Sequence, residues 1–203
     1  GDPDVFARSG EEIAALAAPA QRYAERSGPL NVLVVGGSLG AQALNDAVPR
    51  ALTLIPAGER PRVTHQSGAK QIEALHAAYA VAGVEAELLG FIDDVAARYA
   101  AADLVICRAG ALTVAELSAA GVASVLVPFP HAVDDHQTGN ARFLSEAGAA
   151  ILLPPADLTP EKLAGLLREL TREKLAAMAE KARALAKPEA TRAVAEICME
   201  VAR

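Results

Sequence analysis

The sequence predicts an α/β domain built on a doubly wound, six-stranded parallel sheet of the Rossmann-like kind. Short apolar runs alternate regularly with segments of helical periodicity from Leu30 onward. Some of these runs, such as NVLVV at 31–35, are continuously apolar, which is typical of strands buried on both faces. The segments between the runs are long enough for the crossover helices that parallel neighbours require.

Each expected strand is followed by a loop or a helix in chain order. Strands are expected within 31–37, 62–68, 85–95, 103–110, 124–130 and 149–155. Helices are expected at 42–54, at 69–83, from 113, at 135–147 and beyond 160. Residues 1–29 are rich in Ala, Pro and charge, and we interpret them as an interdomain connection with a short helix at 11–18. Residues 30–203 then form the predicted domain.

Composition limits the classes of partner. The chain has 203 residues, 52% of them apolar, a formal net charge of −6 and no extended run of Lys or Arg. A nucleic-acid partner is therefore not expected, and an acidic lipid surface is a poor one. The longest uncharged stretch, 117–133, is shorter than the roughly 20 residues of a spanning helix. The two cysteines match no metal-binding spacing, and Cys107 is interpreted as a buried strand thiol.

The first strand-to-helix loop is a candidate anion site, because ligands of doubly wound sheets bind beyond the carboxyl ends of the strands. GGSLGAQ at 36–42 lacks both the G-x-G-x-x-G spacing of a dinucleotide site and the G-K-[ST] of a Walker A loop. Its glycines and the Ser38 hydroxyl are nevertheless suited to holding an anion. A tight turn without a ligand explains the same residues, so both interpretations stay open.

The stretch CRAGALTVAELSAAG, 107–121, runs from a strand directly into a helix. Its small residues let a ligand approach the helix N-terminus, where the dipole favours phosphate or carboxylate. Thr113 and Glu116 have the spacing of a capping box, in which the glutamate bonds to the cap N–H. Alternatively, Glu116 faces the crevice and accepts hydrogen bonds from a ribose. Nearby, Asp93-Asp94 is interpreted as a helix start and Arg108 as an ion-pair partner.

The stretch HAVDDHQTGN, 131–140, contains two His and two Asp residues. A metal site is the weaker interpretation, because no further cluster has ligand spacing and Asp134 and Asp135 are suited to capping the next helix. Gln137 and Asn140 lie three residues apart on one helical face, which suits recognition of sugar hydroxyls. An ordinary polar surface is the alternative for these two residues.

Four stretches together resemble the C-terminal half of the MurG family, the bacterial UDP-N-acetylglucosamine transferases of peptidoglycan synthesis. They are VLVVGGSLGAQALN, HQSG, FIDDVAARYAAADLVICRAGALTVAEL and VPFPHAVDDHQTGNARFLSEAGAA. The family has the two-domain GT-B architecture, and the resemblance covers nearly all of 30–203. It implies that this chain is the nucleotide-sugar domain, without the N-terminal acceptor domain. The start GDPDVFAR differs from the family's G-N-P-V-R connection, so Arg8 is displaced from the place of the family's arginine.

The resemblance implies an inverting transferase that moves GlcNAc from UDP-GlcNAc to the C4 hydroxyl of the MurNAc unit of lipid I, undecaprenyl-pyrophosphoryl-MurNAc-pentapeptide. The product, lipid II, supports cell-wall synthesis and through it cell shape and division. The parent enzyme would be peripheral to the cytoplasmic face of the inner membrane, and this soluble piece would be inactive alone. No cofactor and no protein-bound metal is implied. Another UDP-sugar GT-B transferase and a stand-alone nucleotide-sugar binding module are the alternatives.

The resemblance also implies a role for each matching residue. The backbone of Ile92 would read the uracil edge beside Phe91, and Glu116 would hold the ribose hydroxyls. The residues implied for the diphosphate are Ser38, Ala111, Leu112 and Thr113, and those implied for the GlcNAc hydroxyls are Gln137 and Asn140. No catalytic base is implied within this chain, and the final helix at 189–202 is expected to cross to the other domain.

Overall fold

The computed structural model describes residues 10–37, 41–130 and 135–186. Within these residues six strands form one parallel sheet in the order β3-β2-β1-β4-β5-β6. The strands are β1 (Asn31–Val35), β2 (Arg62–Gln66), β3 (Glu87–Leu89), β4 (Leu104–Cys107), β5 (Ala123–Leu126) and β6 (Ala150–Leu152). The prediction of a doubly wound six-stranded parallel sheet is confirmed. Each strand is shorter than the expected run, and most of the runs end in a stretch with glycine or proline that forms a loop.

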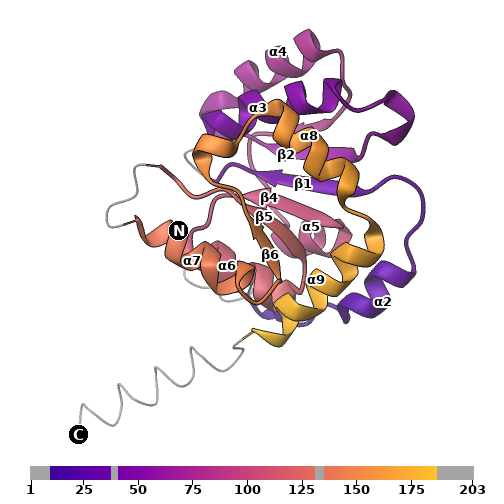
Figure 1. Cartoon of the computed structure of the whole chain (residues 1–203), viewed down its shortest axis with the longest axis vertical. Coiled ribbons are helices and arrows are strands. Elements are labelled where there is room, and N and C mark those ends of the chain that lie inside the picture. The colour runs from indigo at the N-terminus through magenta and orange to yellow at the C-terminus, as the bar shows by residue number, and fades with distance from the viewer. Residues whose placement is uncertain (1–9, 38–40, 131–134, 187–203) are drawn as a thin grey trace, which may run out of the picture.

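Helices connect the strands in chain order (Figure 1). They are α2 (Pro19–Ala24), α3 (Gln42–Thr53), α4 (Ile72–Ala82), α5 (Val95–Ala101), α6 (Ala111–Ala120), α7 (His136–Ser145), α8 (Pro160–Glu169) and α9 (Arg172–Ala184). Short 3-10 turns occur at Ala57–Glu59, Ala69–Gln71 and Pro155–Asp157. Asp94 caps α5 as expected, with its carboxylate accepting from the Ala97 N–H at 2.8 Å.

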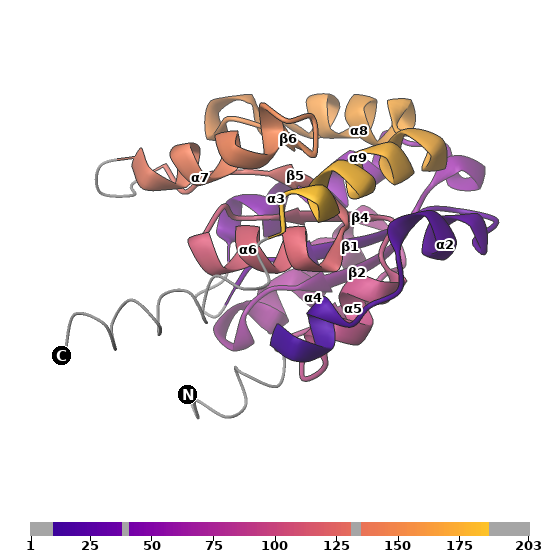
Figure 2. The same ribbon diagram turned by 90° about the horizontal axis from the view of Figure 1, so that it is seen from below.

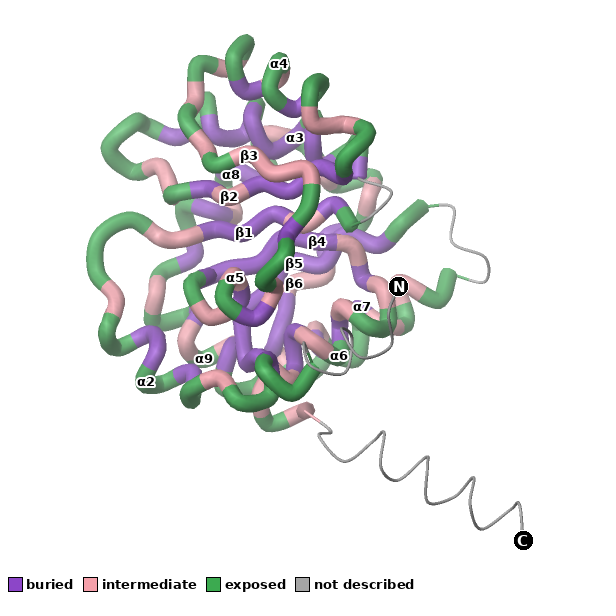
Figure 3. The backbone as a smooth tube through the Cα atoms, turned by 180° about the vertical axis from the view of Figure 1, so that it is seen from behind, coloured by how far each residue is buried: buried purple, intermediate pink, exposed green. Residues whose placement is uncertain are grey.

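The sheet separates two apolar clusters, one on each face. Side chains of a strand alternate between faces, so Val34 and Ile106 enter one cluster while Leu33 and Val105 enter the other. Helices α3, α4, α8 and most of α9 pack on the first face, and α5, α6 and α7 pack on the second. Figure 1 shows α8 and α9 in front of the strands, whereas Figure 3, from behind, shows α5 in front of them and the strands buried.

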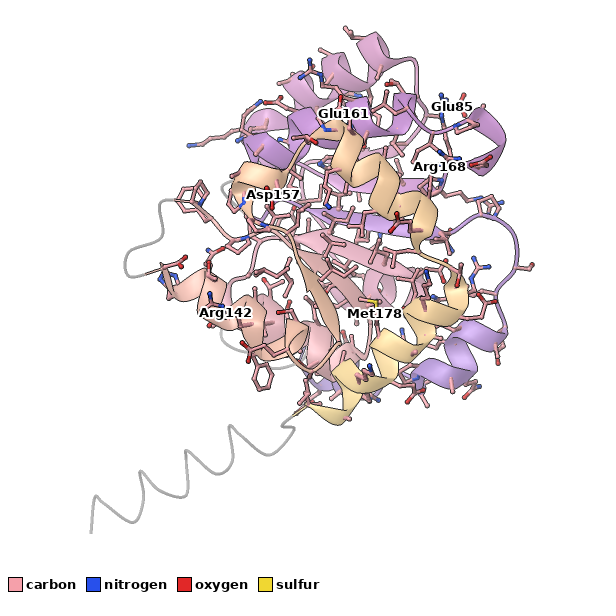
Figure 4. All side chains as sticks on the ribbon, in the orientation of Figure 1. Glu85, Arg142, Asp157, Glu161, Arg168 and Met178 are labelled. Carbon is pink, nitrogen blue, oxygen red and sulfur yellow. The ribbon has the colours of Figure 1, made fainter. Side chains whose placement is uncertain are left out.

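The outer helices are amphipathic, which fixes the face that each one buries. On α8, Leu163 and Leu167 are buried against the first cluster, whereas Glu161 and Arg168 lie on the exposed face. Met178 of α9 packs against the same cluster, and Figure 4 shows it close to the strands while Glu161 and Arg168 point outward. The apolar stripes of these helices therefore close one side of the sheet.

Part of the expected connection, residues 10–29, packs against the domain. Residues 10–14 are helical, and α2, which the sequence did not predict, lies beside α9 in Figures 1 and 2. Tyr23 is buried, and its hydroxyl donates to the Asp103 carbonyl at 2.7 Å. The Arg22 guanidinium donates to the carbonyls of Ala120 and Gly121, at 2.6 Å and 2.5 Å, which satisfies the C-terminal end of α6.

Candidate functional site

The topology has its switch point where β1 and β4 end side by side, and we call the region beyond these two strand ends the crevice. Val35 of β1 pairs with Cys107 of β4, and the chain leaves these two strands toward opposite faces of the sheet, to α3 and to α6. Such a switch point is where doubly wound sheets bind ligands. The carboxyl ends of the strands lie on the left in Figure 1, at the side where α7 begins.

Helix α6 presents an open N-terminus to this crevice. It begins at Ala111, after Gly110 in an extended conformation with φ −63° and ψ 147°. No side chain in the described part of the chain caps this end. The capping-box interpretation is wrong, because Thr113 lies inside the helix rather than at its cap. The unpaired N–H groups of the first turn are thus available to an anion.

Glu116 lies one turn further along α6 and is half-buried. Its Oε2 accepts a hydrogen bond from the Tyr99 hydroxyl of α5 at 3.1 Å. Burial raises the pKa of Glu116, and the Tyr99 hydrogen bond opposes that rise. The carboxylate is therefore held by a side chain from another helix and not by the N-terminus of its own helix. It keeps lone pairs for further donors.

The loop after β3 lies against the same helix. Ile92 is only 8% exposed and belongs to the cluster that contains Val114 and Leu117 of α6. Phe91, its neighbour, is 68% exposed. The buried Ile92 side chain anchors the loop in the apolar cluster that Val114 and Leu117 of α6 also join. The two segments expected to recognise uridine thus contribute side chains to one cluster.

Gln137 and Asn140 of α7 contact the neighbouring strand-end loops. Gln137 Oε1 accepts from the Phe129 N–H at 2.9 Å, and Asn140 Nδ2 donates to the Ala109 carbonyl at 3.0 Å. These bonds join α7 to the loops after β5 and β4, so the two side chains are more than a solvated helix surface. Each amide keeps further donor or acceptor capacity for a ligand.

Arg108 lies at the same edge, directly after β4. Its Nη1 donates to the Val127 and Pro128 carbonyls at 3.3 Å and 3.0 Å, and its guanidinium lies over the Phe129 ring, 5.5 Å from the centroid. Burial lowers its pKa from the usual arginine value. The ion pair expected for Arg108 is not formed with any described carboxylate. Carbonyl groups and an aromatic ring orient it instead.

Sequence reasoning missed the role of Gln66 at the end of β2. Its Nε2 donates to the carbonyls of Gly37 and Gly90, at 3.2 Å and 3.1 Å, and its Oε1 accepts from the Gly37 N–H at 3.1 Å. One buried amide thereby joins the loop after β1 to the loop after β3. The only sequence signal was a polar residue at the end of a buried strand, and its partners are 24 and 29 residues away.

His65, beside Gln66, has a structural environment. Its Nδ1 lies 3.0 Å from the Tyr79 hydroxyl and its Nε2 lies 3.0 Å from Asn45 Oδ1. Burial lowers the pKa of His65 to about 3, so the imidazole is neutral. Cys107 is also buried, as expected, and burial raises the pKa of its thiol to about 12.

Several predicted features lie outside the described residues. These are Arg8, Ser38, His131, Asp134, Cys198 and the helix expected at 189–202. Asp135 does stand before the first residue of α7, but its carboxylate accepts from the Thr138 hydroxyl at 2.6 Å and makes no cap bond to the backbone. Among the residues that are described, no group of three His, Cys, Asp or Glu side chains is arranged to hold a metal ion.

A separate concave surface lies at the amino-terminal ends of β1, β2 and β3. It is lined by residues that include Arg60, Arg62, His76 and Arg98. Arg98 is paired there with Glu87, with nitrogen-to-oxygen distances of 2.6 Å and 2.7 Å. None of the predicted site residues lines this surface. The crevice at the carboxyl ends, where those residues gather, is therefore the candidate site.

A parallel sheet whose crossover helices cover both faces, with a switch point between β1 and β4, defines a Rossmann-like α/β domain. The chain belongs to the glycosyltransferase family 28 C-terminal domain family, which matches residues 31–197. The expected fold, the C-terminal domain of a GT-B glycosyltransferase, is thereby confirmed.

Similar proteins cover 93% or more of the chain. A UDP-N-acetylglucosamine–N-acetylmuramyl-(pentapeptide) pyrophosphoryl-undecaprenol N-acetylglucosamine transferase from Azoarcus sp. (strain BH72) is 66% identical over 209 residues, covering 100% of this chain and 59% of the relative. The transferase of the same name from Aromatoleum aromaticum is 68% identical over 191 residues, covering 94% of this chain and 54% of the relative. The crystal structure of Acinetobacter baumannii MurG matches with a TM-score of 0.86 and 46% identity, covering 93% of this chain and 55% of the MurG chain.

The chain spans a little more than half the length of these relatives, between 54% and 59%. No helix among the described residues is long and apolar enough to cross a membrane.

Proposed function

We propose that this chain is the donor-binding domain of an inverting transferase that moves GlcNAc from UDP-GlcNAc to lipid I, forming lipid II in peptidoglycan synthesis. The names of the similar proteins support the reaction, and the architecture of the chain supports the donor half of it. The observation that carries the proposal is the arrangement of α6, whose uncapped N-terminus opens at the switch point one turn before the Glu116 carboxylate.

The diphosphate binds at the start of α6. The N–H groups of Ala111, Leu112 and Thr113 point toward the crevice, and the helix dipole favours negative charge there. Gly110 and Ala111 have no long side chain to block the approach of a phosphate. Ser38, which follows β1 in the sequence, is proposed as a further donor through its hydroxyl. Together these donors stabilise the negative charge that develops on UDP as the glycosidic bond breaks.

Uridine binds between α6 and the loop after β3. The Glu116 carboxylate accepts hydrogen bonds from both ribose hydroxyls. The main chain of Ile92 pairs with the uracil edge, and the exposed Phe91 ring covers the base from the side. Main-chain recognition distinguishes uracil from cytosine. Uracil presents a carbonyl and an N–H at the edge where cytosine presents an amine and a ring nitrogen without a hydrogen.

The sugar lies toward α7, where Gln137 and Asn140 contact the GlcNAc hydroxyls. Their existing bonds to Phe129 and Ala109 hold both amides at the mouth of the crevice. The acceptor, lipid I, binds to a second domain, and the base that takes the acceptor proton lies in that domain or in the cleft between the two domains. The complete enzyme works as a peripheral protein at the cytoplasmic face of the inner membrane, in cell-wall growth and division.

Calorimetry on the 203-residue chain tests the donor proposal. UDP-GlcNAc and UDP should bind, CDP should bind more weakly, and ADP-ribose and NAD should not compete. Ile92→Val should bind UDP like the wild type, since no main-chain group is removed. Equal affinity for UDP and CDP would exclude uracil readout at this loop. A preference for UDP-glucose over UDP-GlcNAc would instead favour another UDP-sugar transferase.

The role of Glu116 has its own test. Glu116→Ala should weaken UDP binding by about 1.5–3 kcal/mol, the range for hydrogen bonds to a charged group. The analogue 2′,3′-dideoxy-UDP should bind both forms almost equally, because it lacks the hydroxyls. Glu73→Ala, which removes an exposed carboxylate from α4, is the matched control and should leave UDP affinity unchanged. A Glu116→Ala chain that keeps its UDP affinity would contradict the ribose contact.

A further inference from the structure

We infer that Tyr99 is a positioning residue for nucleotide recognition, because its hydroxyl holds the Glu116 carboxylate in place for the ribose of a nucleoside diphosphate. The inference rests on the proposed function of the crevice. It assigns a role in donor binding to α5, because Tyr99 of this helix acts through Glu116 and does not touch the donor.

Packing in the apolar cluster does not require the polar hydroxyl of Tyr99. The side chain is only 2% exposed and belongs to the cluster between the sheet and helices α5, α6 and α7. A phenylalanine ring would fill the same space without the cost of burying a hydroxyl. The hydroxyl donates to Glu116 Oε2 at 3.1 Å, so its burial is compensated by the residue proposed to hold the ribose.

The distance between α5 and α6 is held by a third residue. Arg22 donates to the Tyr99 carbonyl of α5 at 3.4 Å and to the Ala120 and Gly121 carbonyls at the end of α6. This single buried guanidinium spans the two helices and fixes their relative position. The Tyr99 hydroxyl therefore stays within hydrogen-bond distance of Glu116 before any ligand arrives, which lowers the entropic cost of binding.

The hydrogen bond also keeps Glu116 in the state that a ribose requires. Burial raises the pKa of Glu116, and the Tyr99 donor counteracts this by stabilising the charged form. The other titratable group acting on this pair is Cys107 of β4, whose own pKa is raised to about 12 by burial, so it stays neutral. One carboxylate oxygen serves Tyr99, and the remaining lone pairs accept from the 2′ and 3′ hydroxyls.

Tyr99→Phe in the 203-residue chain tests the inference, with UDP and 2′,3′-dideoxy-UDP as probes in calorimetry between pH 5 and pH 8. UDP affinity should fall about three- to tenfold at pH 7.5, the loss expected for one hydrogen bond, and should fall further as the pH is lowered. The affinity for dideoxy-UDP should not change. The pH at which UDP binding weakens should be higher in the variant than in the wild type, since Glu116 loses the donor that favours its charge.

Tyr23→Phe is the matched control, because it also removes a buried tyrosine hydroxyl bond, to the Asp103 carbonyl, away from the crevice. It should change stability without changing the affinity for UDP or the pH profile of binding. The inference is overturned if Tyr99→Phe binds UDP like the wild type across the pH range. It is also overturned if the variant loses UDP and dideoxy-UDP equally, which would show a structural role alone.

A measurement on the unmodified chain covers the case in which Tyr99→Phe does not fold. The carboxyl carbon of Glu116 and the hydroxyl proton of Tyr99 should both shift in NMR spectra when UDP binds, and should shift much less with dideoxy-UDP. Resonances that do not respond to UDP would overturn the inference even where UDP binds. If the wild type binds no UDP, the proposed function fails first and the inference with it.

Discussion

Buried polar residues in the sheet differ in whether the fold supplies them with a partner. His65 is fully buried and lies between two partners, Tyr79 and Asn45. Ser124, in the middle of β5, is equally buried, but its Oγ has no hydrogen-bond partner among the described residues. The same degree of burial therefore has opposite consequences for the free energy of unfolding.

Replacing Ser124 should stabilise the protein. Ser124→Ala removes an unsatisfied hydroxyl, whose burial costs about 1–3 kcal/mol, and should raise the free energy of unfolding by about 1 kcal/mol. Urea denaturation monitored by circular dichroism measures this change. Ser67→Ala is the control, because the buried Ser67 hydroxyl donates to the Gly68 carbonyl at 3.0 Å. The control should lose stability, and a loss in Ser124→Ala as well would show that its hydroxyl is satisfied.

His65 should make the protein less stable in acid. Its folded pKa, about 3, lies below the ordinary value of 6.5, so between these values the unfolded chain binds a proton that the folded chain excludes. The free energy of unfolding should therefore decrease as the pH falls below about 6.5, by at most about 1.4 kcal/mol per pH unit. His65→Gln removes this titration and should flatten that part of the profile. Parallel profiles for the wild type and the variant would contradict the assignment of this destabilisation to His65.

At the scale of elements, the N-terminal segment, α6 and α9 meet at one glycine. Gly121 ends α6 with φ +60°, and a Cβ there would lie 2.8 Å from Pro19 Cγ and 2.9 Å from Arg183 Cβ. Glycine is required both for the left-handed backbone and for this close approach. Helix packing in this region therefore depends on a residue without a side chain.

A pair of glycine substitutions separates these two effects. Gly83 ends α4 with φ +62°, but nothing lies within 4 Å of a Cβ built there. Gly83→Ala should cost only the backbone strain, about 1–2 kcal/mol. Gly121→Ala adds the steric overlap, about 1–3 kcal/mol more. Thermal or urea unfolding of both variants compares them, and equal losses would show that Pro19 and Arg183 move aside without cost.

At the scale of the whole molecule, the proposed function predicts binding without turnover. Transfer requires the acceptor hydroxyl to be held against the anomeric carbon, and the proposed acceptor domain lies outside these 203 residues. The chain should therefore fold, bind UDP-GlcNAc and form no disaccharide from a lipid I analogue. Radiolabelled GlcNAc transfer, with and without the separately expressed N-terminal half of a relative, measures this. Turnover by the chain alone would place a base and an acceptor site within it.

The number of strands, their parallel direction and the general location of the site could be predicted, since they follow from local patterns and a general rule. Continuous apolar runs and helical periodicity identify the strands and most of the helices, and parallel sheets place ligands at the carboxyl ends of the strands. The resemblance then added residue roles at those ends. The helix α2 was not predicted, because α2 is short and is stabilised by distant groups, such as the Ala120 and Gly121 carbonyls, 98 and 99 residues from Arg22.

By itself, the sequence determined the α/β class, the six parallel strands and the family, because these depend on the order of apolar and polar residues along the chain. It left open whether Glu116 caps its helix or faces a ligand. Only the tertiary structure decided against the cap, by starting α6 at Ala111 and bringing the Tyr99 hydroxyl to the carboxylate. It also gave Gln66 its partners on two loops. Hydrogen bonds between distant segments depend on how helices and strands pack, and spacing along one chain does not contain that information.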